Sequence, residues 1–246
     1  MVLVSKDENL TYHDVEFRRV REKKPTILVV SFGSVRGTHD RASSSTTQAI
    51  LHFRDAYPHV TIDHHQMAST YNNNMQDEWC ISKFRDHCEY YIRQDYDQII
   101  KRDHIVKLYE FMEKNKDVFL ASPRCNSREG APLSYNDQYK RMPIWLPFDE
   151  EGRRVSKYVS YNAAMFRMEM FNFMEPPYFT DMYVSNGDKQ AKRIDGLAMM
   201  NHKSNQAGLK KVMLYNIVVG HIREEENWPQ ENLVLFNTIA CGKVHR

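Results

Sequence analysis

The sequence lacks the features that would place the chain in a membrane or in an oxidising compartment. No apolar run approaches the roughly 18–20 residues that span a bilayer. Lys6, Asp7 and Glu8 follow closely after Met1, where a signal peptide would carry an apolar core. The four cysteines form no C-x-x-C pair, which argues against a zinc or redox motif. We therefore expect no membrane span and a reduced protein of the cytoplasm, or of the host cytoplasm if the protein is viral.

Glycine and proline are also scarce, at nine each in 246 residues, and no run of them divides the chain. We therefore expect a single domain over residues 1–246, a length that can bury a full core. An excess of charge of one sign is missing too, because 34 Lys and Arg stand against 32 Asp and Glu. The overall charge therefore indicates neither nucleic acid nor a membrane as a partner, although local basic clusters are present.

Apolar strand-like runs alternate along the chain with segments of helical periodicity. A continuous apolar run predicts a buried strand over 26–32, a helix follows over 41–57, and a second strand is expected over 59–63, ending in Asp63. This order indicates a right-handed crossover in a parallel sheet. Further elements are expected as helix 76–87, strand 90–93, helix 103–115, strand 117–122, helix 195–206 and strand 210–222, with Gly208 ending the last helix. The sequence therefore predicts an α/β fold with an open, mostly parallel sheet flanked by helices.

The strand expected over 90–93 leads into two acids, Asp95 and Asp97. In an extended segment, residues two apart point to the same side, so both carboxylates can converge on one hard cation. Open α/β sheets bind their ligands at the carboxyl ends of their strands. The pair therefore predicts a divalent metal site, although acids also occur at strand ends by chance.

Three segments follow one another in an order that resembles a known family. Residues 89–108 contain a strand, the acid pair, a short loop and a helix opened by an acid. Residues 161–171 contain a small-residue strand and a phenylalanine-bearing turn, and residues 195–221 contain an acid-led helix, an Ala-Gly stop, a strand and a terminal histidine. Together they resemble the GT-A fold glycosyltransferases, especially the large inverting family two. The resemblance extends over 26–223 and implies a Rossmann-like GT-A domain, with a nucleotide-binding part over about 26–125 and an acceptor-side part over about 126–246.

The resemblance implies a metal-dependent transfer of a sugar from a nucleoside-diphosphate sugar, with UDP as the expected nucleotide, to an acceptor hydroxyl. Negative charge grows on the leaving diphosphate as the anomeric bond breaks, and Mn²⁺ or Mg²⁺ would neutralise it. Asp97 is the first candidate for the metal, with Asp95 on the donor ribose, on the metal or on its water. His221 is a further candidate ligand, which suits Mn²⁺ better than Mg²⁺. A strand-end histidine without such a role is the alternative for His221.

An inverting transferase needs a carboxylate base for the acceptor hydroxyl. Asp195 is the best positional match, Asp188 is its competitor, and Asp181 comes third. An Asp at a helix opening also serves as an N-cap. The sequence departs from the family here, because Asp195 has no adjacent acid and stands thirteen residues before Gly208. Both the base and the inverting outcome therefore stay open.

The loop after the first strand supplies further candidates for the donor. Ser31 and Gly33 lie where the family's first loop wraps the nucleobase, and Arg36 would approach the phosphates. Asp63 would meet the nucleobase or the ribose, unless it only terminates a surface strand. On the acceptor side, Trp145 offers an aromatic face to a sugar or a base, or packs a long loop onto the core.

The acceptor itself is not fixed by the sequence. A glycan, a lipid-linked sugar, a protein and a hydroxymethylated base in phage DNA all fit. Basic clusters that would grip DNA phosphates lie at 18–24, 101–102, 153–154 and 210–211. The rival functions are a non-catalytic nucleic-acid-binding protein, which would use these clusters alone, and a nucleotidyltransferase. A nucleotidyltransferase would have a lysine in the glycine-bearing loop 33–37, which carries Arg36 instead. The oligomeric state is not indicated.

Overall fold

The computed structural model describes residues 26–32, 40–67, 73–95, 97–125, 134–135, 141–142, 148–184, 192–223 and 233–235. Three predicted site residues, Gly33, Arg36 and Asp188, lie outside this part of the chain, as do Trp145 and the basic cluster 18–24. The side chain of His221 lies outside it as well, although the backbone at this position belongs to a described strand.

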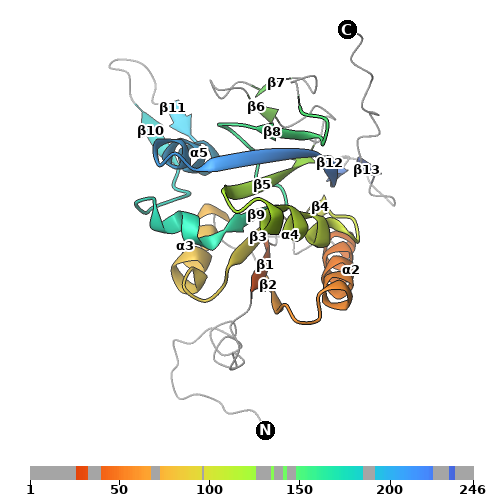
Figure 1. Ribbon diagram of the computed structural model, residues 1–246. Coiled ribbons are helices and arrows are strands. Elements are labelled where there is room, and N and C mark those ends of the chain that lie inside the picture. The colour runs from red at the N-terminus through yellow and green to blue at the C-terminus, as the bar shows by residue number, and fades with distance from the viewer. Residues whose placement is uncertain are drawn as a thin grey trace, which may run out of the picture.

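A nine-stranded sheet forms the centre of the protein, and its main path runs in the order β13-β12-β5-β9-β3-β1-β2 (Figure 1). Strands β1, β2 and β3 are parallel to one another, and so are β5 and β12. Strand β9 lies antiparallel between β3 and β5. The strands are β1 (Ile27–Phe32), β2 (Ile62–Met67), β3 (Tyr90–Asp95), β4 (Gln98–Ile99), β5 (Val118–Cys125), β8 (Arg153–Val155), β9 (Ala164–Arg167), β12 (Lys210–Arg223) and β13 (Leu233–Leu235).

Short strands outside this path complete the β-structure of the described residues. Strands β4 and β8 each pair with β12. Two small hairpin-like sheets are formed by β6 (Ser134–Tyr135) with β7 (Arg141–Met142) and by β10 (Met182–Val184) with β11 (Lys192–Ile194). All of these pairings are antiparallel.

Helices cover both faces of the sheet, which explains why five of the six residues of β1 are apolar. Ile27 and Val29 pack in the core under α2 (Asp40–Ala56) and α4 (His104–Lys114). Leu28 and Val30 pack in a second core, together with side chains of α3 (Asn73–Phe84), the 3₁₀ helix η1 (Met168–Asn172) and α5 (Gly196–Gln206). A strand that is buried on both faces is expected to be a nearly continuous apolar run. The fold is therefore mixed α/β with a mostly parallel sheet, compatible with a Rossmann-like arrangement, as the sequence predicts.

Most predicted elements are confirmed to within three residues, and Gly208 has a φ of 70° directly after α5, as expected for a glycine that ends a helix. The prediction for the second strand is wrong. Strand β2 begins at Ile62, so Asp63 is its second residue and does not follow its end. The misplacement has a physical cause: β2 is an edge strand of half-buried polar residues, so its apolar pattern is weak.

Among the described helices, none combines the length and the apolarity that crossing a membrane requires.

Candidate functional site

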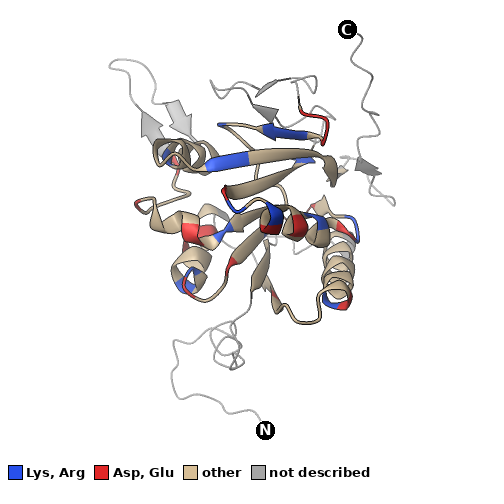
Figure 2. Cartoon of the chain, viewed as in Figure 1, with Lys and Arg blue, Asp and Glu red and all other residues tan. Residues whose placement is uncertain are grey.

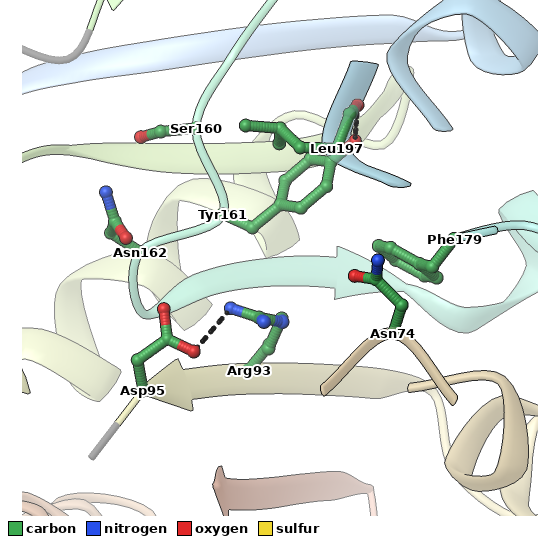
Figure 3. Close-up of a pocket in the computed structure, with 8 residues that line it drawn as sticks. All are labelled: Asn74, Arg93, Asp95, Ser160, Tyr161, Asn162, Phe179 and Leu197. Carbon is green, nitrogen blue, oxygen red and sulfur yellow. Dashed lines mark hydrogen bonds and ion pairs between the residues drawn. The ribbon is translucent and has the colours of Figure 1, made fainter. Parts of the chain in front are cut away.

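A pocket of about 210 Å³ lies at the carboxyl end of β3, and we call it the β3 pocket (Figure 3). Asp95 and Asn162 lie toward one end of it, and Asn74 and Phe179 toward the other. It is lined by Asn74, Arg93, Asp95, Ser160, Tyr161, Asn162, Phe179 and Leu197. The lining side chains come from β3, α3, α5, the segment before β9 and the loop after η1. The sheet therefore presents one of the two predicted acids, Asp95, to a cavity at the expected end of the strand.

The Asp95 carboxylate is held through both of its oxygens. Its Oδ1 lies 2.9 Å from Arg93 Nη1, and its Oδ2 accepts a hydrogen bond from Gln98 Nε2 at 3.1 Å. The side chain is 23% exposed, so it remains accessible from the pocket. Asp95 is therefore an oriented anion, which suits the recognition of a hydroxyl or of a metal-bound water.

Arg93 connects Asp95 to a second acid beneath the pocket. Its Nε lies 2.8 Å from Oδ2 of Asp77 in α3, whose side chain is fully buried. Tyr91 donates its hydroxyl to the other oxygen of Asp77 at 2.7 Å. Burial raises the pKa of Asp77, and Arg93 and Tyr91 oppose this rise. Burial also disfavours the Arg93 charge, but the two carboxylates outweigh it and raise the pKa of the guanidinium.

Strand pairing places the backbones of the other predicted metal ligands, Asp97 and His221, at neighbouring positions. Strand β4 pairs antiparallel with β12 so that His221 faces Gln98, and the Ile222 amide donates to the Asp97 carbonyl at 2.8 Å. Asp97 is only 5% exposed. Within the side chains that the structure describes, no cluster of three or more His, Cys, Asp and Glu could hold a metal; the side chain of His221 is not among them.

The first turn of α5 is held by two of the acids proposed as a base. Asp195 is its N-cap and accepts from the Ala198 amide at 2.8 Å, and its exposed side chain is not part of the pocket lining. Asp181 Oδ1 accepts from the Gly196 amide at 2.8 Å and from Asn74 Nδ2 at 3.1 Å. Asp181 therefore ties a pocket-lining amide to the start of α5.

Gly196 is required by the close contact between α5 and the loop after η1. A Cβ atom at this position would lie 2.0 Å from the Phe179 carbonyl oxygen and 2.7 Å from Asn74 Nδ2. Both neighbours line the pocket. Because Gly196 has no side chain, the start of α5 can pack directly against Phe179 and Asn74, which line the pocket.

Two predicted nucleotide-binding residues do not meet Asp95. Asp63 is in register with Leu28, whereas Asp95 is in register with Phe32, four residues further along β1. At about 3.3 Å per residue this separates the two acids by roughly 13 Å along the strands. Ser31 is near the correct end but is 2% exposed, and its Oγ contacts His64 Nε2 at 2.9 Å on the α2 side of the sheet. Burial lowers the pKa of His64 to about 4, so the imidazole is neutral at pH 7.

In the described clusters 153–154 and 210–211, basic side chains are used within the fold. Lys211 is 1% exposed and donates to the Asn201 carbonyl and to two side-chain oxygens of α5, so it cannot contact DNA. Lys210 lies 2.7 Å from Asp117. Arg153 pairs with two acids, Asp149 and Glu151. Figure 2 shows basic and acidic segments interspersed over the described elements.

Sequence reasoning missed several residues that shape the pocket. A charged residue that directly follows the apolar run 90–92 of a buried strand needs a buried partner, so Arg93 carried a usable signal. Gln98, Asn162 and Asn74 carried none, because polar residues in loops and at helix starts are common.

No protein-family model matches this chain, and no curated protein matches it either. A similar solved structure is that of A197 from STIV, with a TM-score of 0.52, an identity of 10%, and coverage of 80% of this chain and 86% of that chain. At this identity the likeness shows the fold alone, and it agrees with the mixed α/β architecture described above.

Proposed function

We propose that the protein is a metal-dependent glycosyltransferase of the GT-A type that moves a sugar from a nucleoside-diphosphate sugar, with UDP as the expected nucleotide, to an acceptor hydroxyl. One observation carries the proposal: Asp95 lines a pocket at the end of β3, and the backbone of Asp97 lies one position away from His221 in the β4–β12 pairing. The motifs that resemble the family are far apart in the sequence, yet β3, α5 and the segment before β9 all contribute side chains to the pocket, and β12 pairs with β4, whose Gln98 contacts Asp95.

Asp97 and His221 would hold Mn²⁺ or Mg²⁺. A carboxylate and an imidazole fit Mn²⁺ better than Mg²⁺, and the β4–β12 pairing places the two residues at neighbouring positions. The ion would supply positive charge against the leaving diphosphate. Asp95 is engaged by Arg93 and Gln98, which favours a role as hydrogen-bond acceptor for the donor ribose or for a metal-bound water.

The β3 pocket suits the sugar of the donor. Its lining combines neutral hydrogen-bonding groups, Asn74, Ser160 and Asn162, with the aromatic rings of Tyr161 and Phe179. Amides and hydroxyls pair with sugar hydroxyls, and aromatic faces pack on sugar rings. Whole drug-sized ligands occupy about 300–1,000 Å³, so a volume of about 210 Å³ is suited to one part of the donor.

The base stays a prediction, with Asp195 as the candidate and Asp188 as its competitor. N-capping of α5 already accounts for an Asp at position 195. Asp181 lies closer to the pocket through its hydrogen bond to Asn74.

Within the part of the chain that the structure describes, the charge distribution does not favour DNA as the acceptor. Three of the predicted cationic contacts, Lys210, Lys211 and Arg153, are ion-paired or buried. Among the described residues of these clusters, this leaves the exposed Lys101 and Arg102 and the half-buried Arg154. On the described residues, a glycan or lipid-linked hydroxyl therefore fits better than modified DNA, and a non-catalytic DNA-binding protein fits least.

The full chain should be tested by thermal shift with UDP-, GDP- and CDP-sugars, with and without Mn²⁺, and by release of the nucleoside diphosphate. We expect stabilisation and turnover that need both a nucleotide-sugar and Mn²⁺, and both should be lost in Asp97→Asn. Asp63→Asn is the matched control, because Asp63 lies at the opposite end of the sheet, and it should behave as the wild type. Full Mn²⁺-dependent turnover in Asp97→Asn would refute the metal assignment, and no affinity for any nucleotide-sugar would refute the function.

A further inference from the structure

Gln98 is a fully buried amide that connects two walls of the β3 pocket without lining it. Its Oε1 accepts from the Asp95 backbone amide at 3.1 Å. Its Nε2 donates to Asp95 Oδ2 at 3.1 Å and to Asn162 Oδ1 at 2.5 Å. The side chain of Gln98 therefore links Asp95, at the end of β3, to Asn162, which precedes β9.

The backbone of Gln98 links Asp95 to the other predicted metal ligands, Asp97 and His221. Gln98 directly follows Asp97 in the chain and faces His221 across the β4–β12 pairing. Gln98 is thus adjacent to all three predicted metal-site residues. Its side chain contacts Asp95, a peptide bond joins it to Asp97, and strand pairing places it opposite His221.

Gln98 is itself fixed from the opposite face of the sheet. Its carbonyl accepts from Gln94 Nε2 at 3.0 Å, and Gln94 Oε1 accepts from Thr46 Oγ1 in α2 at 2.6 Å. Thr46 is fully buried and Gln94 is 1% exposed. A continuous polar connection therefore runs from α2 through the sheet to the pocket.

Asn162 is fixed from its other side as well. The next residue, Ala163, has a φ of 48°, and its carbonyl contacts His104 Nε2 at 2.9 Å. A non-glycine residue in the left-handed region is maintained only where its surroundings determine it. Asn162 is therefore placed by Gln98 and by a constrained backbone, rather than by chance on a surface loop.

We propose that Gln98 is a positioning residue, which sets the arrangement of Asp95 and the neighbouring metal ligands relative to Asn162 in the sugar pocket; this inference rests on the proposed function. An amide is needed because the position requires both an acceptor, for the Asp95 amide, and a donor, for two oxygens. A methionine offers neither at useful strength, and a glutamate at neutral pH places a second carboxylate against Asp95.

The test compares the full-length wild type with Gln98→Met and Gln98→Glu, with Tyr90→Phe as a control. Tyr90→Phe removes hydrogen bonds to Glu113 and Arg167 at the other end of β3. Mn²⁺ affinity is measured by titration with electron paramagnetic resonance, and kcat and KM are measured on a UDP-sugar. Loss of a residue that orients metal ligands typically reduces metal affinity or activity about 10–100-fold. We expect that loss in both Gln98 variants and not in Tyr90→Phe, with a larger change in kcat than in KM.

Mn²⁺ affinity and the split between kcat and KM separate positioning from a merely structural role. A loss of stability alone lowers the melting temperature and leaves the Mn²⁺ affinity and the kcat of the folded protein at wild-type values, whereas a loss of positioning changes both.

The outcomes also separate this inference from the proposed function. Wild-type binding of Mn²⁺ and nucleotide, together with variants that lose only melting temperature, overturns the positioning role and leaves the function standing. A wild type that binds neither Mn²⁺ nor nucleotide overturns both. If Gln98→Met fails to fold, the Mn²⁺ affinity and the kcat of the nearly isosteric Gln98→Glu still decide the question.

Discussion

Replacing Arg93 by methionine should destabilise the protein strongly, because Arg93 neutralises Asp77 in the core. In Arg93→Met the Asp77 carboxylate stays fully buried. Tyr91 still donates to its Oδ1, but its Oδ2 loses the contact with Arg93. Removing one partner of a buried ion pair costs about 3–5 kcal/mol. Since a domain has about 5–15 kcal/mol of stability in total, we expect a large fall in the urea midpoint.

The loss should depend on pH in a defined direction. Burial raises the pKa of Asp77 even with Arg93 present, and it will rise further without Arg93. An acid whose pKa is higher in the folded state binds more protons when folded. The destabilisation is therefore absent below the unfolded pKa and complete above the folded one. In urea denaturation, the loss in Arg93→Met should shrink from about pH 7 to about pH 4.

Two further variants make the reasoning refutable. Arg93→Met combined with Asp77→Asn removes the buried charge and should be more stable at about pH 7 than Arg93→Met alone. Arg153→Met is the matched control, since Arg153 also bridges two acids but lies at the surface, and it should lose less than about 1 kcal/mol. If Arg93→Met loses no more than Arg153→Met, the carboxylate of Asp77 is not an uncompensated charge in the core.

Three other predictions concern α5 and β12. Burial lowers the pKa of Lys211 to about 7, so the unfolded chain binds more protons above that pH. Stability measured by urea denaturation should therefore rise from about pH 7 to about pH 10, and this rise should be absent in Lys211→Met. Gly196→Ala should lose about 1–3 kcal/mol by forcing the Phe179 carbonyl away. Gly208→Ala, which meets no atom within 4 Å, should lose about 1–2 kcal/mol through its backbone alone. Only Gly196→Ala should also weaken sugar-donor binding in a thermal-shift assay. Asp195→Asn retains an N-cap but not a base, so stability close to wild type with turnover reduced about 100-fold or more identifies the base. Unchanged turnover would assign Asp195 to capping alone.

The parts of the fold that were predictable are those whose position in the sheet dictates their composition. Strand β1 is buried on both faces, so its apolar run was unambiguous, and α4 shows a regular apolar face. Strand β2 pairs with one neighbour only and contains polar residues such as His64 and His65, so its start was misplaced and Asp63 with it.

The candidate site was predictable only where the direction of a strand decides at which edge of the sheet a residue lies. Asp95 was expected at the carboxyl end of a parallel strand, and in the structure it ends β3 and lines a pocket there. The contacts of Gln98 and of Asp77 depend on how far a side chain reaches across from one element to another. Local sequence patterns contain no such information, because α3 and β4 are positioned by the packing of the whole sheet.

The antiparallel insertion of β9 has a consequence for how the molecule can be divided. Among the described strands, β3 and β5 are joined through β9 alone, by four register positions on one side and two on the other. A fragment that stops after β5 would therefore have a gap of one strand width in the middle of its sheet. The half over residues 26–125 cannot form a continuous sheet during synthesis until residues 164–167 have emerged to fill that gap. Splitting the gene between the two halves should accordingly yield pieces that become ordered only when mixed.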